Sequence, residues 1–267
     1  MSARLAEAAR QTVAIAESGR YRNSLGDEVS IREAVRAAVA GTRLYLPDTK
    51  LGDAIADSDS APQVEVTDES TLAAARRVGP GAACLVFASA KNPGGGFLGG
   101  AKAQEESIAR SSALYPCLRS APDFYAFHRA QRDLRYSDRV IYSPDVPVFR
   151  DDKLALLDKP YPATFLTAAA PNLGAIMRNA PHLADDVPAV FAQRTRRVLR
   201  VAAAHHHRRL VLGAWGCGAF GNDPVLVAGV FAEALREGAA FDLVVFAVRD
   251  NLPGTPAYQA FVRRFGH

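Results

Sequence analysis

The chain has 267 residues, of which 49% are hydrophobic and 22% charged, and its formal net charge is +4. This composition is that of an ordinary globular protein, and no apolar run approaches the roughly 20 residues that span a bilayer. The three cysteines, Cys84, Cys117 and Cys217, are far apart and odd in number. They argue against a disulfide framework or a Cys-x-x-Cys metal site and indicate a reducing, cytoplasmic location. The first twenty residues lack a sustained apolar core, so we expect no signal peptide.

The N-terminal part of the chain is predicted to be helical. Residues 3–17 and 30–40 are rich in alanine and carry apolar side chains at helical spacing. Ser30, followed three positions later by Glu33, is expected to form a capping box for the second helix.

A polar stretch, residues 44–62, follows these helices and contains a proline towards each end, as is typical of a linker. We therefore divide the chain into an N-terminal helical segment with its linker, residues 1–61, and a main domain, residues 62–267. The mild positive charge suits an anionic substrate, but many proteins without such a substrate share it.

The main domain is predicted to alternate strands and helices. Apolar runs and alternating polarity predict strands over residues 63–67, 82–88, 139–143, 146–149, 163–168, 210–212 and 242–248. Helical spacing predicts helices over residues 68–78, 107–115, 188–204, 224–237 and 255–265. Asp68 is expected to cap the first of these helices, and Pro116 to end the second. Strands that alternate with helices in this way indicate a three-layer α/β/α fold.

Two glycine-rich turns each follow an expected strand and precede an expected helix. Residues 94–99 and residues 216–221 both satisfy the pattern GxGxxG. Such a turn can present backbone N–H groups to a phosphate, and the two turns would meet at the carboxyl ends of the sheet strands. The alternative is tight packing between strand and helix without a ligand. Trp215 and Phe220 in the second turn disfavour it, because their exposure without a ligand is costly.

Two familiar nucleotide sites are less consistent with these turns. A Rossmann site would place an acidic residue at the end of a strand about 20 residues beyond the motif, and none is found there. A P-loop is disfavoured because Lys102 is not followed directly by Ser or Thr.

The first turn leads directly into Gln104, Glu105 and Glu106. Neighbouring residues on a helix point about 100° apart, so the two carboxylates diverge and are not the opposed pair of an ordinary glycosidase. One can act as an acid while the other binds hydroxyl groups. The alternative is a solvated helix N-terminus, where acids are favoured by the helix dipole. Beside a loop so rich in glycine, we favour hydrolysis of a phosphate-bearing substrate.

The two stretches NPGGGFLGGAKAQEE, residues 92–106, and GAWGCGAFGND, residues 213–223, resemble the paired motifs of bacterial-type poly(ADP-ribose) glycohydrolases. The resemblance covers roughly residues 62–267. It implies a macrodomain, a mixed sheet between helices that binds ADP-ribose, here with an N-terminal helical extension. It also implies hydrolysis of ribose–ribose bonds in an exo mode, without a metal or other cofactor. The expected partners are poly(ADP-ribose) and ADP-ribosylated proteins, with neither membrane nor sequence-specific nucleic acid.

Position by position, the resemblance implies that Glu106 is the catalytic acid–base and that Glu105 binds ribose hydroxyls. Asn92 would contact the distal ribose, and Gln104 would place the acidic pair. The substrate-binding residues implied for the two loops are Gly94, Gly95, Gly96, Phe97, Gly216, Cys217, Gly218, Ala219, Phe220 and Gly221. Phe220 would pack on the distal ribose. Asp68 and Phe246 are candidate adenine contacts.

Alternatives with the same pocket are an ADP-ribose-binding macrodomain without turnover and a hydrolase of mono-ADP-ribosylated targets. A Rossmann oxidoreductase is more distant. Outside the motifs, we interpret residues 205–209, HHHRR, as a solvated helix end. Arg194, Arg196 and Arg197 are expected on an exposed helix face, and Cys217 has no neighbouring base that would make it a nucleophile.

Overall fold

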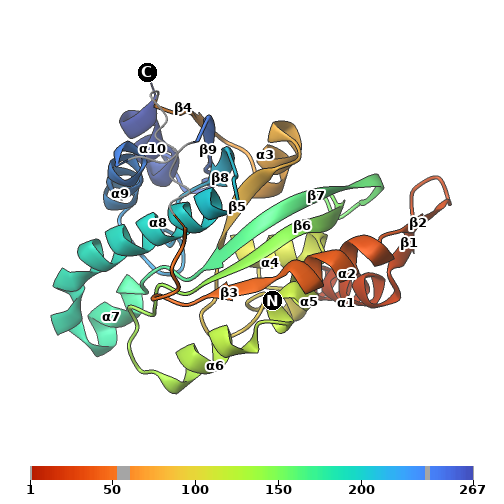
Figure 1. The fold of residues 1–267 in the computed structure, drawn as a ribbon, viewed down its shortest axis with the longest axis horizontal. Helices are drawn as coiled ribbons and strands as arrows, with labels where there is room; N and C mark the ends of the chain where they lie inside the picture. Colours follow the sequence, from red (N-terminus) through yellow and green to blue (C-terminus); the bar gives the residue numbers. More distant parts are fainter. Residues whose placement is uncertain (1, 53–60, 238–240, 267) are drawn as a thin grey trace.

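The computed structural model describes residues 2–52, 61–237 and 241–266, and within them a seven-stranded mixed sheet forms the centre of the molecule (Figure 1). In spatial order its strands are β3 (Arg43–Tyr45), β6 (Val140–Arg150), β7 (Leu156–Ala168), β5 (Ala82–Phe87), β8 (Arg209–Leu212), β9 (Leu243–Ala247) and β4 (Gln63–Thr67). The strands from β7 to β4 are parallel, whereas β6 is antiparallel to both β7 and β3. The sheet is thus mixed, as predicted.

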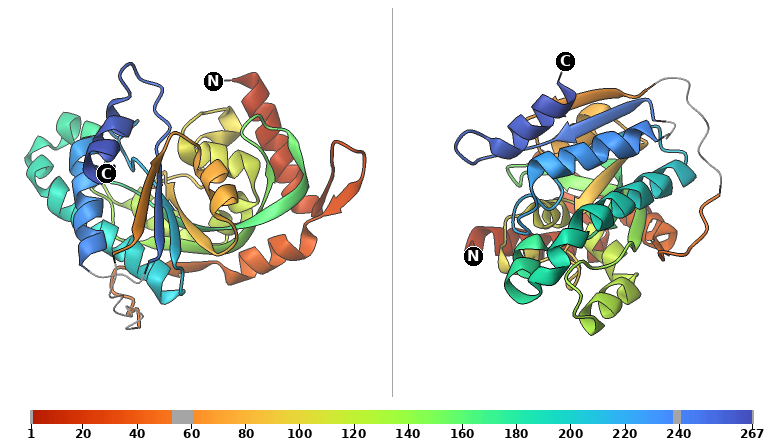
Figure 2. Two further views of the ribbon diagram at one scale, coloured as in Figure 1. Left: turned by 90° about the horizontal axis from the view of Figure 1, so that it is seen from above. Right: turned by 90° about the vertical axis from the view of Figure 1, so that its left-hand side faces the viewer.

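Helices cover both faces of the sheet (Figures 1 and 2). One face carries α1 (Ala3–Ser18), α2 (Arg32–Gly41), α3 (Thr71–Val78), α4 (Gln104–Ser111), α5 (Leu114–Arg119) and α6 (Pro122–Ala130). The other carries α8 (Val187–Ala204), α9 (Pro224–Arg236) and α10 (Pro256–Phe265). The remaining elements are α7 (Leu173–Asn179), the 3₁₀ helices η1 (Phe97–Gly99) and η2 (Pro181–Asp186), and a hairpin of β1 (Arg20–Arg22) and β2 (Glu28–Ser30). The prediction of a three-layer α/β/α fold is confirmed.

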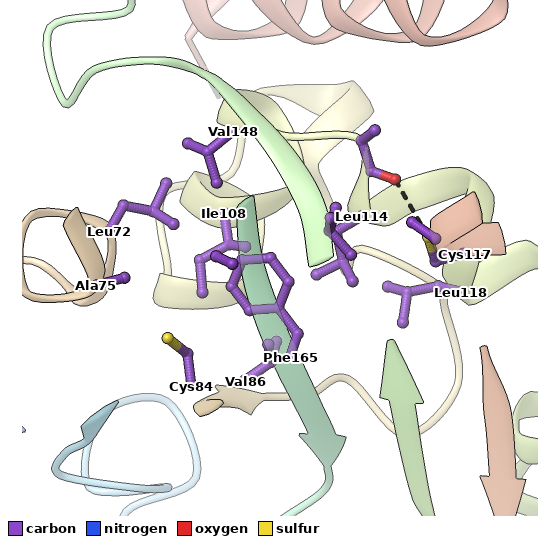
Figure 3. Packing of buried hydrophobic residues seen from close by; sticks show 14 of the residues in the cluster. Leu72, Ala75, Cys84, Val86, Ile108, Leu114, Cys117, Leu118, Val148 and Phe165 are labelled. Atoms are coloured by element: carbon purple, nitrogen blue, oxygen red, sulfur yellow. Dashed lines mark hydrogen bonds between the residues drawn. The ribbon is translucent and has the colours of Figure 1, made fainter. Parts of the chain in front are cut away.

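Strand β5 shows why its sequence is continuously apolar. Cys84 and Val86 point into the core on the face of α3 and α4, whereas Leu85 points into the core on the face of α8 and α9. Figure 3 shows Cys84 and Val86 near Phe165 of β7 and Ile108 of α4. A strand buried on both faces needs apolar side chains at every position, which produces the run seen in the sequence.

Strand β6 was predicted as two short pieces and is one strand. Pro144 and Asp145, between the two pieces, form a bulge, where the register with β7 shifts between Ser143 and Val146. Asp145 takes a positive φ of 45° there. An extra residue of this kind bends a strand without ending it.

Strand β3 overlaps the start of the stretch predicted as a linker, residues 44–62. It pairs with β6 through Arg43 to Tyr45 and forms one edge of the sheet. The N-terminal residues therefore contribute a strand to the main sheet, while the boundary after residue 61 stays a prediction.

The predicted helix termini need correction. Ser30 lies in β2, so it does not cap α2. Helix α3 is capped by Ser70 instead of Asp68, since the Ser70 hydroxyl accepts from the N–H of Ala73 at 3.0 Å. Pro116 does not end the preceding helix: it lies in the first turn of α5, where its missing N–H needs no partner.

Candidate active site

A cleft of about 1400 Å³ opens where β5, β8 and β9 end. It is lined by residues that come after these three strands, in the ranges 87–92, 214–220 and 247–252, and by the start of α4. Residues from the first motif, including Asn92 and the range 104–106, thus share one cleft with residues 216–220 of the second. Parallel strands bring their carboxyl ends to one edge of a sheet, which explains the convergence.

The carboxylate of Glu105 is buried against the first turn. Its side chain is 2% exposed, its Oε2 accepts from the N–H of Ser89 at 2.6 Å, and its Oε1 accepts from the N–H of Gly94 at 3.1 Å. Burial raises the pKa of Glu105, and the nearby charge of Glu106 adds to this, while the two N–H donors act in the opposite direction. Both oxygens are thereby fixed in position.

Glu106 lies on the next residue of α4 and is 9% exposed. Its Oε1 accepts from the N–H of Gly96 at 3.0 Å. Gly95 has a φ of +58°, and a Cβ at this position would overlap Oε1 of Glu106 and lie 2.9 Å from its Cδ. A side chain at position 95 would therefore have to displace the carboxylate of Glu106.

Gln104 connects the start of α4 to the sheet. Its Oε1 accepts from the N–H of Phe87 at 2.9 Å, and its Nε2 donates to the carbonyl of Leu85 at 2.8 Å and to Oγ1 of Thr71 at 3.0 Å. These bonds fix the first turn of α4 against the end of β5. The geometry is that of a residue that places the acidic pair.

The backbone N–H groups of the first turn are occupied. Those of Gly94 and Gly96 donate to Glu105 and Glu106, and that of Gly95 donates to the carbonyl of Asn92 at 3.0 Å. We expected this turn to present N–H groups to a phosphate. In the structure these groups hold the carboxylates instead.

The second turn is open. Within the described residues, the N–H groups of Gly216, Gly218, Ala219 and Phe220 make no hydrogen bond to the protein. Asn222, which is 2% exposed, supports the turn from behind by donating to the carbonyls of Pro171 at 2.8 Å and Gly216 at 3.1 Å. Several such N–H groups in one glycine-rich turn can bind an anion.

Two supporting residues were missed in the sequence. Asn222 is one, and Arg110 is the other: its guanidinium, 2% exposed, donates to the carbonyls of Ala101 at 3.0 Å and Phe97 at 3.4 Å. Arg110 lies four residues after Glu106, and this helical spacing is the signal that places the two on one side of α4. Nothing in its local sequence marks Asn222.

Some predicted residues do not face the cleft. The ring of Phe97 is 1% exposed and packs against Ala9 and Ala109. Phe246 is buried among aromatic rings of α9 and α10, so its side chain is not available to adenine. Gly221 and Asp68 are exposed but lie outside the cleft lining.

Burial also decides what Trp215 and Cys217, in the second turn, can do. Trp215 is fully buried and donates from Nε1 to the carbonyl of Ala168 at 3.2 Å, so the expectation that it is exposed is wrong. Cys217 lines the cleft, but burial raises the pKa of its thiol to about 12. A thiol with so high a pKa is a poor nucleophile at neutral pH.

The arginines predicted on an exposed face of α8 divide into two groups. Arg194 is 1% exposed, pairs with Asp138 at 2.9 Å and donates to the carbonyl of Ala169 at 2.9 Å. Arg197 is also buried and donates to the carbonyl of Thr49, so the prediction is wrong for both. It is right for Arg196, which is exposed.

The histidines after α8 are only partly solvated. His206 is exposed, whereas His205 stacks on Tyr142 with ring centroids 3.6 Å apart, and Nδ1 of His207 lies 2.8 Å from the carbonyl oxygen of Gly81. In the described ranges no three His, Cys, Asp or Glu residues are grouped as ligands of a metal. Nor does any helix in those ranges have both the length and the apolar character needed to cross a bilayer.

A mixed sheet between two helical layers, with two buried carboxylates at its carboxyl edge, is what the resemblance to a macrodomain hydrolase implied. The family described as "Microbial-type PARG, catalytic domain" matches residues 9–151. The chain belongs to this family of poly(ADP-ribose) glycohydrolases, which confirms the resemblance drawn from the two motifs.

Solved structures agree with this assignment. Poly(ADP-ribose) glycohydrolase from Thermomonospora curvata is 51% identical, with a TM-score of 0.93 over 99% of this chain and 100% of that one. The same enzyme bound to the inhibitor ADP-HPD gives a TM-score of 0.91 with the same identity and coverage. Poly(ADP-ribose) glycohydrolase from Deinococcus radiodurans in complex with ADP-ribose is 46% identical, with a TM-score of 0.85 over 89% of this chain and 99% of that one. Comparison with curated proteins gave no match.

Proposed function

We propose that this chain is a poly(ADP-ribose) glycohydrolase that cleaves the ribose–ribose O-glycosidic bond and releases ADP-ribose. The observation that carries the proposal is the arrangement of Glu106, whose carboxylate is held by the N–H of Gly96 in the same cleft as the free amides of the second turn. The relatives with bound ADP-ribose and bound inhibitor support a cleft of this class.

The terminal ADP-ribose unit is placed by complementary chemistry. Its diphosphate fits the free N–H groups of Gly216 and residues 218–220, which lead into the N-terminus of α9. Phe220 and Tyr136, whose ring centroids are 6.1 Å apart, both line the cleft and offer an aromatic surface to the distal ribose. Asn92, in the first motif, also lines the cleft.

Glu106 carries the proton transfers. As general acid it protonates the leaving 2′-oxygen while the bond to the anomeric carbon breaks and positive charge develops on the ribose. The negative diphosphate stabilises that charge. Glu106, now ionised, removes a proton from a water molecule that attacks the anomeric carbon, which restores the acid and yields ADP-ribose.

Glu105 has a different role because both of its oxygens already accept backbone N–H groups. Each oxygen retains a second lone pair that can accept from a ribose hydroxyl. We assign Glu105 to holding the ribose in position beside Glu106.

The finer features of the function remain proposals. We expect release of single ADP-ribose units from chain ends, ADP-ribosylated proteins as the source of substrate, and a cytoplasmic location consistent with three unpaired cysteines. Incubation with defined poly(ADP-ribose) tests the first point. Products of ADP-ribose alone indicate exo cleavage, whereas short oligomers indicate endo cleavage.

Replacing Glu106 by Gln tests the proposal as a whole. The variant loses the proton transfers, so the release of ADP-ribose should fall by at least about 10²-fold, the range of general acid–base catalysis. Binding of ADP-ribose, measured by calorimetry, should change little. Glu33→Gln, an exposed change on α2, is the matched control and should retain full activity.

Turnover by Glu106→Gln at the rate of the unmodified protein would overturn the assignment of Glu106. Binding of ADP-ribose by the unmodified protein with no release from the polymer would favour a macrodomain that binds without turnover.

A further inference from the structure

The cleft is larger than one ligand requires. Its volume of about 1400 Å³ exceeds the about 300–1,000 Å³ of ordinary ligand pockets. Beyond Glu106 the cleft continues along α4 to the first turn of α1 and to the connection between β6 and β7. We call this part the outer lobe; it is lined by Arg4, Leu5, Lys102, Ser107, Lys153 and Leu154.

Three cations, Arg4, Lys102 and Lys153, form one wall of the outer lobe, and all three are exposed. They come from distant parts of the chain and are brought together by the start of α1. The N–H of Ser2 donates to the carbonyl of Gly100 at 3.4 Å, and Nη2 of Arg4 donates to the carbonyl of Lys153 at 3.3 Å. Figure 2 shows the first turn of α1 beside the β6–β7 connection.

The carboxylates near this basic wall are engaged elsewhere. Asp151 accepts from the N–H groups of Lys153 and Ala155, and Asp152 accepts from the hydroxyl of Ser70 and pairs with Arg249. Within the described residues, no carboxylate forms an ion pair with Arg4, Lys102 or Lys153. The wall therefore offers positive charge to an anion in the cleft.

The basic wall and the open amides come from different segments of the cleft lining. The second turn is beside α7, where the N–H of Gly174 donates to the carbonyl of Phe220 at 2.9 Å. In the view of Figure 1 the β6–β7 connection lies on the opposite side of the molecule from α7, and the N-terminus, where α1 begins, lies between them. A bond cleaved at Glu106 would join a unit held by the open amides to a unit that extends towards the wall.

We propose that the basic wall binds the pyrophosphate of the ADP-ribose unit that becomes the leaving group. This inference rests on the proposed glycohydrolase function and adds a second phosphate site to it. It explains the size of the cleft and the sign of the charge along its outer lobe. It also implies that the protein prefers a leaving unit with a pyrophosphate to the same sugar without one.

Two substrates separate this site from the site of the terminal unit. The first is a dimer of ADP-ribose, and the second is ADP-ribose joined through its anomeric carbon to the 2′-oxygen of adenosine, which lacks the second pyrophosphate. The charge-reversed variant Arg4→Glu/Lys102→Glu/Lys153→Glu should lose about tenfold or more of kcat/KM on the dimer, since each exposed ion pair contributes modestly. Its kcat/KM on the adenosine compound should stay within about twofold of the unmodified protein, because that compound has no anion for the wall.

Two further variants serve as controls. Arg4→Glu/Lys153→Glu leaves the residues next to α4 unchanged and should show a smaller loss in the same direction. Lys159→Glu, an exposed change on β7 outside the cleft, should leave both substrates unaffected. Raising the salt concentration should reduce the dimer preference of the unmodified protein more than that of the triple variant.

Equal kcat/KM on the dimer for the triple variant and the unmodified protein would overturn the inference and leave the glycohydrolase function standing. A parallel loss on both substrates would overturn it as well, since the wall would then act on the terminal unit or on the fold. Failure of the unmodified protein to cleave either substrate would overturn the proposed function and this inference together.

Discussion

The two glycine turns share the pattern GxGxxG but use their backbone N–H groups in different ways. In the first turn, the N–H groups of Gly94 and Gly96 donate to Glu105 and Glu106, which lie only 11 and 10 residues further along the chain. In the second, the N–H groups of Gly216 and residues 218–220 make no hydrogen bond within the part of the chain that the structure describes, and Asn222 supports the turn from behind.

In these two turns, the difference follows the first residues of the next helix. Where two acids begin that helix, their side chains fold back onto the turn, which then fixes a pair of carboxylates. The helix after the second turn begins with Asp223 and Pro224. Oδ1 of Asp223 accepts from the N–H of Val225 at 2.9 Å, so this side chain caps its own helix and leaves the turn open for an anion. We therefore propose that one turn positions the catalytic groups and that the other binds the substrate.

The largest effect is expected from Gly95→Ala, which should impair catalysis at the first turn much more than binding at the second. A methyl group at this position overlaps the carboxylate of Glu106 and must displace it. A displacement of about 1 Å at a reacting group can lower the rate by about 10²-fold, so we expect a loss of kcat of that order. The affinity for ADP-ribose, which depends on the second turn, should fall far less. The value of kcat is measured by release of ADP-ribose, and the affinity by calorimetry.

Gly26→Ala is the matched control for that variant. Gly26 has a φ of +88°, but a Cβ there meets no atom within 4 Å. It therefore shares the backbone strain of Gly95 without the close approach to Glu106. A loss of kcat in Gly26→Ala equal to that in Gly95→Ala would show that strain, and not displacement of Glu106, causes the effect.

Much of the fold could be predicted from local patterns. Strand β5 is continuously apolar because both of its faces are buried, and α8 and α9 carry apolar side chains at helical spacing. The two motifs placed the site because parallel strands deliver their ends to one edge. In each case the signal lies within a short stretch of chain.

The features that were missed depend on residues distant in sequence. Arg194 is buried because Asp138, on another segment, pairs with it. Trp215 is buried because Phe191 and Phe231 of α8 and α9 pack on its ring. Strand β3 is too short to show a period, and only its pairing with β6 defines it. Such contacts arise from tertiary structure and leave no local pattern.

Within the second turn, Gly216→Ala should weaken the binding of ADP-ribose. Gly216 has a φ of +74°, and a Cβ would lie 2.5 Å from Nδ2 of Asn222 and 2.7 Å from Cβ of Ala170. Strain of about 1–3 kcal/mol at such a position would distort the row of N–H groups, so we expect an affinity about tenfold lower. Turnover at saturating substrate should change less than in Gly95→Ala. Unchanged affinity would contradict the assignment of the diphosphate to this turn.

Helix α4, which follows the first turn, is held to α1 and β6 by Thr12, and this contact contributes to stability. The hydroxyl of Thr12 donates to the carbonyl of Arg110 at 2.6 Å and accepts from Nε of Arg150 at 3.1 Å. Thr12→Val leaves both buried groups without this partner and should lower the free energy of unfolding by about 1–3 kcal/mol. Thr12→Ser retains the hydroxyl and should recover most of the loss in urea denaturation. Equal losses in the two variants would assign the effect to packing.

The smallest expected effect concerns the pH dependence of stability at Glu105. Burial raises the pKa of this carboxyl above the ordinary 4.5, so the folded protein retains a proton that the unfolded chain releases. The free energy of unfolding should therefore decrease as the pH rises from 4.5 towards the raised pKa, because ionisation then favours the unfolded chain. Glu105→Gln cannot ionise and should lack this part of the decrease. The free energy of unfolding of both proteins is measured by urea denaturation near pH 4.5 and near neutrality. Other groups titrate alike in the two proteins. The difference between their slopes of unfolding free energy against pH therefore reports Glu105. Identical slopes would mean that the N–H groups of Ser89 and Gly94 stabilise the ionised carboxylate enough to offset its burial, and the first turn would then hold a charge as the second turn is proposed to do.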